Sequence, residues 1–332
     1  MAYPASASLR TVRVLVTGAS GFVGRWVVAA LQKRGAEVAV VAREPDRLPV
    51  QSAAAARVFR ADCARPGALA SPLERWRPAV VFNLAGYGVA KNERDPALMR
   101  RLNVELLAEV VEGLARLPAP SWPGLRLVHA GSALEYGELD VPLDESAAAH
   151  PTTSYGQSKF AGTEVVQRAV REQNLPALVA RLFTVFGPGE RDGRLFPTLL
   201  AARSHQEAVP LSSGEQQRDF GLVWDVAEAL VDLALAPKAA VLACEPPFEH
   251  AVLNVASGRL SSVRTFVVEA AQALGIAPSR LAFGAKAQLP EEMPHLPVPV
   301  ARLQRALGRT LPGDLAVLMA RVRVALDRGV HG

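Results

Sequence analysis

The stretch TGASGFVG, residues 17–24, lies where a predicted strand gives way to a predicted helix. Residues 12–17, VRVLVT, are typical of a buried strand, and residues 22–35, FVGRWVVAALQKRG, have the spacing of an amphipathic helix closed by glycine. In such a unit the glycines let the main chain approach a phosphate, and the helix N-terminus faces the negative charge. The glycines are expected in the tight turn, at the pyrophosphate and against the strand, in the order Gly18, Gly21 and Gly24. The spacing G-x-x-G-x-x-G in this context predicts a coenzyme site.

The first half of the chain continues to alternate strand-like and helix-like runs, which is typical of parallel α/β folds. Further strands are expected at residues 37–42, 56–62, 79–85, 125–131 and 177–183. One long helix is expected from about Pro96 to Leu117, and another holds Tyr155. This alternation predicts a Rossmann fold with a doubly wound parallel sheet.

The pattern changes after GPGERDG, residues 187–193, where helices, loops and proline-rich joints follow. We expect a smaller, mainly helical substrate-binding domain over the carboxyl ends of the strands, where open α/β sheets bind their ligands. The two domains are interleaved in sequence. The coenzyme-binding domain is predicted as residues 1–186 plus about 219–258, and the substrate-binding domain as about 187–218 plus 259–332.

The composition is that of a globular protein, with 332 residues of which 50% are hydrophobic and 21% charged. The net charge of +5 comes from arginines spread along the chain without a basic block, so we predict no nucleic-acid partner. The polar start MAYPASASLR and the lack of an uncharged apolar run predict neither a secretory signal nor membrane insertion. Two cysteines, Cys63 and Cys244, predict no disulfide framework, no metal site and a cytoplasmic protein.

The end of the second predicted strand, VVARE, bears on the choice of nicotinamide coenzyme. An acidic residue there binds the ribose hydroxyls of NAD, whereas an arginine accommodates the 2′-phosphate of NADP. Ala42 and Arg43 stand at this point, and Glu44 follows one residue late. Arg25, in the first turn of the first helix, is a candidate second contact; the alternative is that both arginines are solvated surface residues. We predict NADP(H) as the favoured coenzyme, with NAD as the alternative.

Several modest motifs follow one another in a defined order and spacing along the rest of the chain. They are NLAG at 83–86, GSALEYG at 131–137, SYGQSK at 154–159, RLFTVFGPGE at 181–190 and RDFGLVWD at 218–225. Together with TGASGFVG and Asp62, they make the chain resemble the extended short-chain dehydrogenase/reductase family, in its nucleotide-sugar epimerase, dehydratase and reductase branch. The resemblance runs from about Val12 to about Arg323 and implies a nucleotide-sugar substrate.

The sequence offers two tyrosine–lysine pairs four residues apart, Tyr155 with Lys159 and Tyr87 with Lys91. Residues at this spacing share one face of a helix. The resemblance identifies the first pair as catalytic, because it opens a helix and Ser132 precedes it at the edge of the sheet. In the implied chemistry the serine hydroxyl binds the substrate oxygen and the tyrosine transfers a proton. Lys159 is expected to lower the pKa of Tyr155 by its charge and to hold the nicotinamide ribose.

The resemblance also implies the remaining site residues. The coenzyme site is expected to comprise Gly18, Ser20, Gly21, Phe22, Val23, Gly24, Arg25, Arg43, Asp62, Cys63, Leu84, Ala85, Gly86, Asn103, Tyr155 and Lys159. The substrate site is expected to comprise Ser132, Ala133, Thr184 and Arg218. Arg218 is implied as the diphosphate clamp, with an ion pair to Asp219 or Asp225 as the alternative. Asp62 is expected to reach the adenine amino group of the coenzyme, with a turn-forming role as the alternative.

Residues 133–135 bear on the reaction. In the family's 4,6-dehydratases a proton-transferring acid and base occupy the positions of Ala133 and Leu134, neither of which can move a proton. Glu135 comes one residue late and is expected to point to the opposite side of a strand-like segment. The resemblance therefore favours an NADPH-dependent reductase of a 4-keto (deoxy) sugar nucleotide. The alternatives are a sugar-nucleotide 4-epimerase, a flavonoid-type ketone reductase and a non-catalytic NADP sensor. A homodimer through the helices that contain Asn103 and Tyr155 is also implied.

Overall fold

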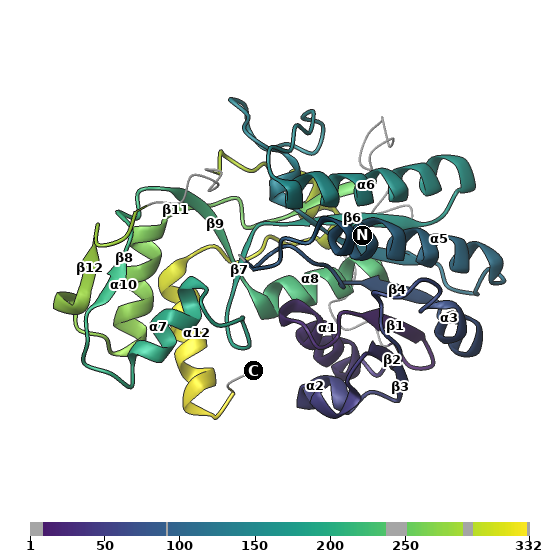
Figure 1. Ribbon diagram of the computed structural model, residues 1–332, viewed down its shortest axis with the longest axis horizontal. Helices are drawn as coiled ribbons and strands as arrows, with labels where there is room; N and C mark the ends of the chain where they lie inside the picture. Colours follow the sequence, from purple (N-terminus) through teal and green to yellow (C-terminus); the bar gives the residue numbers. More distant parts are fainter. Residues whose placement is uncertain (1–8, 91, 237–250, 288–294, 331–332) are drawn as a thin grey trace.

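The computed structural model describes residues 9–90, 92–236, 251–287 and 295–330 (Figure 1). Its centre is a seven-stranded sheet with the strand order β10-β6-β5-β4-β1-β2-β3, in which every pair of neighbours is parallel. The strands are β1 (Arg13–Thr17), β2 (Glu37–Ala42), β3 (Arg57–Arg60), β4 (Val80–Asn83), β5 (Leu127–Ser132), β6 (Ala177–Leu182) and β10 (Val252–Val255). The predicted Rossmann fold is confirmed.

Helices cover both faces of this sheet because its strands are apolar on both sides. In β1, Val14 and Val16 pack in the same cluster as α1 (Phe22–Lys33) and α8 (Val223–Leu235), whereas Leu15 packs with the helices of the opposite face. That face is covered by α3 (Ala70–Trp76), α5 (Leu106–Arg116) and α6 (Ser154–Gln173). Figure 1 shows the two helical layers on either side of the strands. Because β1, β4 and β5 are parallel neighbours, their carboxyl ends lie at the same edge of the sheet.

The long helix predicted from about Pro96 to Leu117 is interrupted. It consists of α4 (Pro96–Arg100), a π turn η2 (Arg101–Glu105) and α5, with Asp95 capping its N-terminus. Such a turn holds one residue more than an α turn, so single-sequence periodicity does not detect it. Asn103 lies in the turn, and α6 approaches it so closely that a Cβ added at Gly162 would lie 2.5 Å from the Asn103 carbonyl oxygen.

The smaller part of the molecule combines helices with short strands. Strands β7 (Thr184–Phe186), β9 (Gln217–Leu222) and β11 (Leu260–Ser262) form one sheet, and β8 (Val209–Leu211) pairs with β12 (Leu281–Phe283). Helices α7 (Leu195–Ala202), α10 (Val263–Leu274) and α12 (Leu315–Asp327) pack on them around four phenylalanines: Phe186, Phe196, Phe220 and Phe266. The sequence did not predict these short strands.

The remaining elements are short. They are η1 (Pro45–Arg47), α2 (Val50–Ala53), η3 (Ala133–Glu135), η5 (Pro278–Arg280) and α11 (Ala301–Leu307), of which α11 packs against β10 and α8. Across the described ranges, none of the helices combines the length and the apolar content that a membrane span requires. Lys91 and Cys244 lie outside the described residues.

Candidate active site

The glycine turn is packed too tightly for side chains. Gly18 has a φ of +69°, and a Cβ added there would lie 2.5 Å from the main-chain nitrogen of Ala85. A Cβ at Gly24 would collide with the Gly18 carbonyl, and the Gly21 N–H donates to that same carbonyl at 2.9 Å. The structure thus brings the turn against Leu84 and Ala85 at the end of β4. Phe22 and Val23 open α1, so the N-terminus of α1 faces the space above the turn.

Arg25 bends back over the turn. Its Nη2 donates to the Ser20 carbonyl at 3.3 Å and its Nε to the Gly21 carbonyl at 3.4 Å. Burial lowers the pKa of Arg25 from its ordinary value. The hydrogen bonds of Arg25 are therefore made with the glycine turn, and its side chain also lies against Gly189 in the loop after β7.

Arg43 lies at the end of β2 with 69% of its side chain exposed. Its Nη2 is 3.3 Å from a carboxylate oxygen of Glu44, and the same carboxylate is 2.8 Å from Arg47. Exposed pairs of this kind contribute little stability, so an anionic ligand can displace Glu44 at small cost. Asp62 follows the neighbouring strand β3. Its carboxylate accepts from the Ala64 N–H at 3.0 Å, the contact expected of a turn-forming aspartate.

Two residues beside the turn complete the predicted coenzyme set. Burial and the Asp62 charge raise the pKa of the Cys63 thiol to about 11, so the thiol stays protonated at neutral pH. Gly86 lies against Asn103, since a Cβ added at Gly86 would lie 3.2 Å from the Asn103 side-chain oxygen. Cys63 is therefore an uncharged side chain at the strand ends, and Gly86 leaves room there for the Asn103 side chain.

Asn103 ties the loop after β4 to α6. Its side-chain oxygen accepts from the Tyr87 N–H at 3.0 Å, and its amide nitrogen donates to the Tyr87 carbonyl and to Ser158 Oγ, each at 2.8 Å. The π turn aims this side chain at both partners. Asn103 thereby fixes the main chain of Tyr87 beside the helix that carries Tyr155. Tyr87 is part of this structural network, and its sequence partner Lys91 lies outside the described residues.

Ser132 and Tyr155 meet at the carboxyl end of β5. Ser132 Oγ accepts from the Leu134 N–H at 3.2 Å, and its hydrogen bond to Tyr155 stabilises the ionised phenol. Burial and the charge of Glu135 nevertheless raise the pKa of Tyr155. The pKa of Tyr155 is therefore raised overall, because desolvation outweighs the favourable contacts near the phenol, and a lowering contribution from Lys159 stays a prediction.

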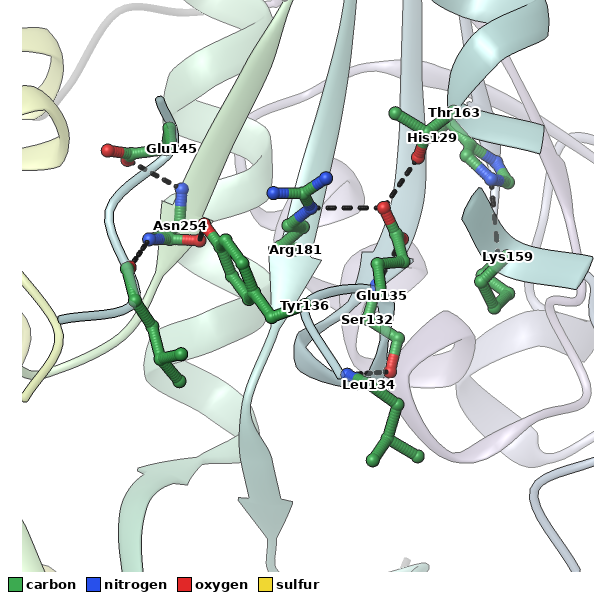
Figure 2. Close-up of polar contacts among 11 residues, drawn as sticks. His129, Ser132, Leu134, Glu135, Tyr136, Glu145, Lys159, Thr163, Arg181 and Asn254 are labelled. Carbon is green, nitrogen blue, oxygen red and sulfur yellow. Dashed lines mark hydrogen bonds and ion pairs between the residues drawn. The ribbon is translucent and has the colours of Figure 1, made fainter. Parts of the chain in front are cut away.

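Lys159 lies one turn after Tyr155 on α6 and is 3% exposed. Burial lowers the pKa of its ammonium to about 8, and the negative charge of Glu135 opposes that shift. Its Nζ lies 3.3 Å from Nε2 of His129, a fully buried residue of β5 (Figure 2). Sequence reasoning missed His129, although a histidine within the apolar run LRLVHAG is a signal of a buried polar partner.

Glu135 is fully buried, and the segment that carries it is not the strand-like one expected. The segment is a 3₁₀ turn, and Glu135 reaches back to accept from the Ser132 N–H at 2.7 Å in a capping box. It also accepts from Thr163 Oγ1 at 2.7 Å and from Arg181 Nε at 3.0 Å (Figure 2). The Arg181 guanidinium lies over the Tyr136 ring, 4.3 Å from its centroid. This buried network holds Ser132 in place.

Thr184 and Arg218 lie in the same three-stranded sheet. Thr184 is paired with Phe220, two residues beyond Arg218 on β9. The two acids considered as partners for Arg218 have other contacts: Asp225 forms a bidentate pair with Arg321, and Asp219 accepts from Ser257 and Gly258. Burial, and to a smaller extent the Arg218 charge, lower the pKa of His295 to about 3. Ala133, the remaining predicted substrate residue, is buried beside Ser132.

Two contacts join the smaller part to the coenzyme-binding part next to this site. Glu93 accepts from the N–H groups of Gly88 and Ala90, and it pairs with Arg191 at 2.6 Å. Trp26 on α1 donates to the Pro188 carbonyl at 2.9 Å. These contacts fix the loop after β7 over the end of β4 and α1.

The comparisons with known proteins agree with this geometry. Residues 14–242 match the NAD dependent epimerase/dehydratase family. The chain belongs to this family. Within it, the motifs and the fold place the chain in the extended short-chain dehydrogenase/reductase branch, as the sequence predicted.

Several proteins similar to this chain are named for sugar-nucleotide substrates. A dTDP-6-deoxy-L-talose 4-dehydrogenase (NAD(P)(+)) of Kitasatospora kifunensis is 35% identical over 263 residues, 77% of each chain. A GDP-6-deoxy-D-mannose reductase of Pseudomonas aeruginosa is 31% identical over 269 residues, 77% of this chain and 78% of that one. The structure of MoeE5 in complex with UDP-glucuronic acid and NAD is 28% identical with a TM-score of 0.75, covering 96% of this chain and 99% of that chain. Family members similar to this chain also include a UDP-glucose 4-epimerase of Streptomyces lividans.

Proposed function

We propose that this family member is an NADPH-dependent reductase of a 4-keto (deoxy) sugar nucleotide. The observation that carries the proposal is the placement of Ser132, Tyr155 and Lys159 at one sheet edge, beside the glycine turn. The coarser assignment, an enzyme that modifies sugar nucleotides with a nicotinamide coenzyme, fits all the relatives compared above. Residues 1–186 plus about 219–258 would bind the coenzyme, and about 187–218 plus 259–332 the substrate.

The glycine turn fits the coenzyme, because side chains are excluded at Gly18 and Gly24 and the α1 N-terminus is open to an anion. The coenzyme supplies a hydride to the carbonyl carbon of the substrate. The Ser132 hydroxyl orients the carbonyl oxygen, and Tyr155 donates its proton to that oxygen as the alcohol forms. The Lys159 ammonium stabilises the phenolate that remains on Tyr155 and has further donors for the ribose. Arg218 and Thr184 would bind the diphosphate and sugar side.

The raised pKa of Tyr155 is consistent with its role as proton donor in the proposed reduction. A tyrosine that keeps its proton at neutral pH is ready to donate it to a ketone. An epimerase must begin by removing a proton from a 4-hydroxyl group, for which an ionised tyrosine is needed. The 4-epimerase is the second candidate, since it would use the same three residues. Dehydration is disfavoured because Ala133 and Leu134 are not titratable and Glu135 is engaged by Arg181.

Coenzyme stoichiometry tests the proposal. Protein stripped of nucleotide is offered 4-keto-6-deoxy sugar nucleotides carrying dTDP, GDP or UDP, with and without NADPH, while absorbance and product are followed together. A reductase is expected to consume one NADPH for each alcohol formed, and to form no alcohol when NADPH is left out. Product from a 4-hydroxy sugar nucleotide with no net coenzyme consumption would establish the epimerase. Coenzyme binding without turnover of any substrate in the panel would favour the sensor.

Arg43 supports NADPH as the coenzyme. Replacing Arg43 with aspartate is expected to lower the NADPH-over-NADH ratio of kcat/KM at least about tenfold, since a charge-assisted contact with the 2′-phosphate contributes roughly 1.5–3 kcal/mol. Arg47→Asp is the matched control, because Arg47 pairs with the same Glu44 carboxylate. It is expected to leave the ratio within about twofold. Equal kinetics with both coenzymes in the parent chain would contradict the NADP assignment.

The expected assembly and location belong to the same proposal. A homodimer would form through the helices that carry Asn103 and Tyr155, and the resemblance alone supports it. No nucleic-acid or membrane partner is proposed, and the location proposed is the cytoplasm. No group of three or more potential metal ligands occurs among the residues that the structure describes, and no metal is proposed.

A further inference from the structure

Three buried side chains lead from the glycine turn to Lys159. Thr17 at the end of β1, Asn83 at the end of β4 and His129 on β5 are each 0% exposed. Thr17 Oγ1 lies 2.6 Å from the Asn83 side-chain oxygen, and the Asn83 amide nitrogen lies 3.1 Å from His129 Nδ1. His129 Nε2 lies 3.3 Å from Lys159 Nζ, and the Ala85 N–H donates to Thr17 Oγ1 at 3.3 Å. Each member has a polar partner on both sides.

The donors and acceptors of this row depend on the charge of Lys159. An ammonium has three donors and no acceptor, so His129 Nε2 must then be bare and accept. The ring proton of neutral His129 consequently lies on Nδ1, where it requires an acceptor. The Asn83 amide provides one when its oxygen and nitrogen exchange places, an orientation of the same shape. Thr17 Oγ1 then accepts from the Asn83 amide and from the Ala85 N–H, which satisfies every group of the row except the hydroxyl proton of Thr17.

We propose that Thr17, Asn83 and His129 are positioning residues that hold Lys159 as an ammonium by giving it a fixed, neutral acceptor. A water molecule in this place would move and reorient, whereas a ring held between two strands keeps its direction. His129 is suited to the role because it remains uncharged: burial and the Lys159 charge lower its pKa well below the ordinary value. A charged imidazole would instead repel the ammonium.

The other charges around Lys159 act in known directions. On η3, Glu135 favours the ammonium, and Arg181 on β6 neutralises much of that charge at 3.0 Å. Tyr155, on the same helix, is uncharged at neutral pH because its pKa is raised. The charges on η2 and α5 are directed to one another or to neighbours, in the pairs Arg101 with Glu109 and Arg100 with Glu105. His129 is therefore the neutral hydrogen-bond partner that can change the pKa of Lys159.

The hydrogen-bond row is tested without any assay of catalysis. The ring nitrogens of His129 are observed by NMR in histidine-labelled full-length protein below pH 8, where Lys159 is charged. We expect a proton on Nδ1 and a bare Nε2, with the His129→Gln spectrum identifying the signals. A proton on Nε2 would mean that Lys159 is not donating, and the proposal would be overturned. This result is independent of the proposed function.

The consequence for turnover rests on the proposed function. His129→Asn keeps a polar group near Nδ1 but none at Nε2, whereas His129→Gln places an amide near Nε2. Under the proposed function, kcat is expected to fall as Lys159 loses its proton, with a midpoint near pH 8. Losing the acceptor lowers the pKa of Lys159, so this midpoint is expected to move to lower pH by about one unit, about 1.4 kcal/mol. At pH 8, kcat of His129→Asn is then expected to fall several-fold, with KM for the sugar nucleotide within about twofold.

His129→Gln is expected to restore most of the pH profile and of kcat. An unchanged profile in His129→Asn, or the same profile in both variants, would overturn the proposal. Thermal unfolding of both variants separates a folding defect from a shifted profile. If Tyr155→Phe kept full turnover, the catalytic assignment would fail, and the NMR result would still decide the role of His129.

Discussion

Replacing Tyr155 with phenylalanine is expected to lower kcat at least about 100-fold while coenzyme binding and folding stay near those of the parent chain. General acid catalysis contributes about 10²–10⁴ to enzyme rates, and no other described side chain that holds a proton is placed beside Ser132 in the same way. Phenylalanine fills the same volume, so the packing of α6 on β5 is kept. The measurement is single-turnover reduction together with a coenzyme titration.

Tyr87→Phe is the matched control. Tyr87 has the same sequence spacing to a lysine, but the structure involves its main chain, not its hydroxyl, in the contact with Asn103. We expect kcat within about twofold of the parent. If Tyr87→Phe were the impaired variant and Tyr155→Phe normal, the active site would have been assigned to the wrong strand end.

Replacing Glu135 with glutamine is expected to lower the free energy of unfolding by about 3–5 kcal/mol. The carboxylate and its partner Arg181 are 0% and 3% exposed, and removing one member of a buried pair leaves the other charge without compensation. The loss would also release the Ser132 main chain, so kcat is expected to fall together with stability. Urea unfolding at constant pH measures the first effect.

Glu138→Gln, three residues further along, provides the comparison, because Glu138 is exposed. Its unfolding free energy is expected to change by less than about 0.5 kcal/mol. A Glu135→Gln variant as stable as Glu138→Gln would show that Arg181 is compensated by solvent or by Tyr136. The position of Ser132 would then need another explanation.

The parts of the fold set by local pattern were predictable. The first strand, the glycine turn and the first helix follow from apolar spacing and from Gly18 and Gly24, where a side chain would collide with the main chain. The observed strand ends differ from the predicted ones by at most two residues. The five short strands of the smaller part were not, since three- to six-residue segments such as β7 and β9 take their conformation from tertiary pairing.

The candidate site was predictable in its members but not in its electrostatics. A spacing of four residues puts Tyr155 and Lys159 on one face of α6, whatever surrounds them. Their pKa shifts depend on burial by distant segments and on Glu135, which is positioned by a capping box and not by the expected strand-like segment. His129 and Arg181 come from neighbouring strands, so only the three-dimensional sheet brings them to Lys159 and Glu135.

The close approach of α6 to the π turn restricts how these two helices can vary. At position 162 any residue larger than glycine would push against the Asn103 carbonyl oxygen, 2.5 Å from the added carbon. Deleting one residue from Arg101–Glu105 would restore a regular α turn, and would rotate Asn103 away from Tyr87 and Ser158. A larger residue at 162 and a shorter turn would thus have to be acquired together. Position 162 and the π turn are therefore expected to change together, although almost sixty residues separate them in the chain.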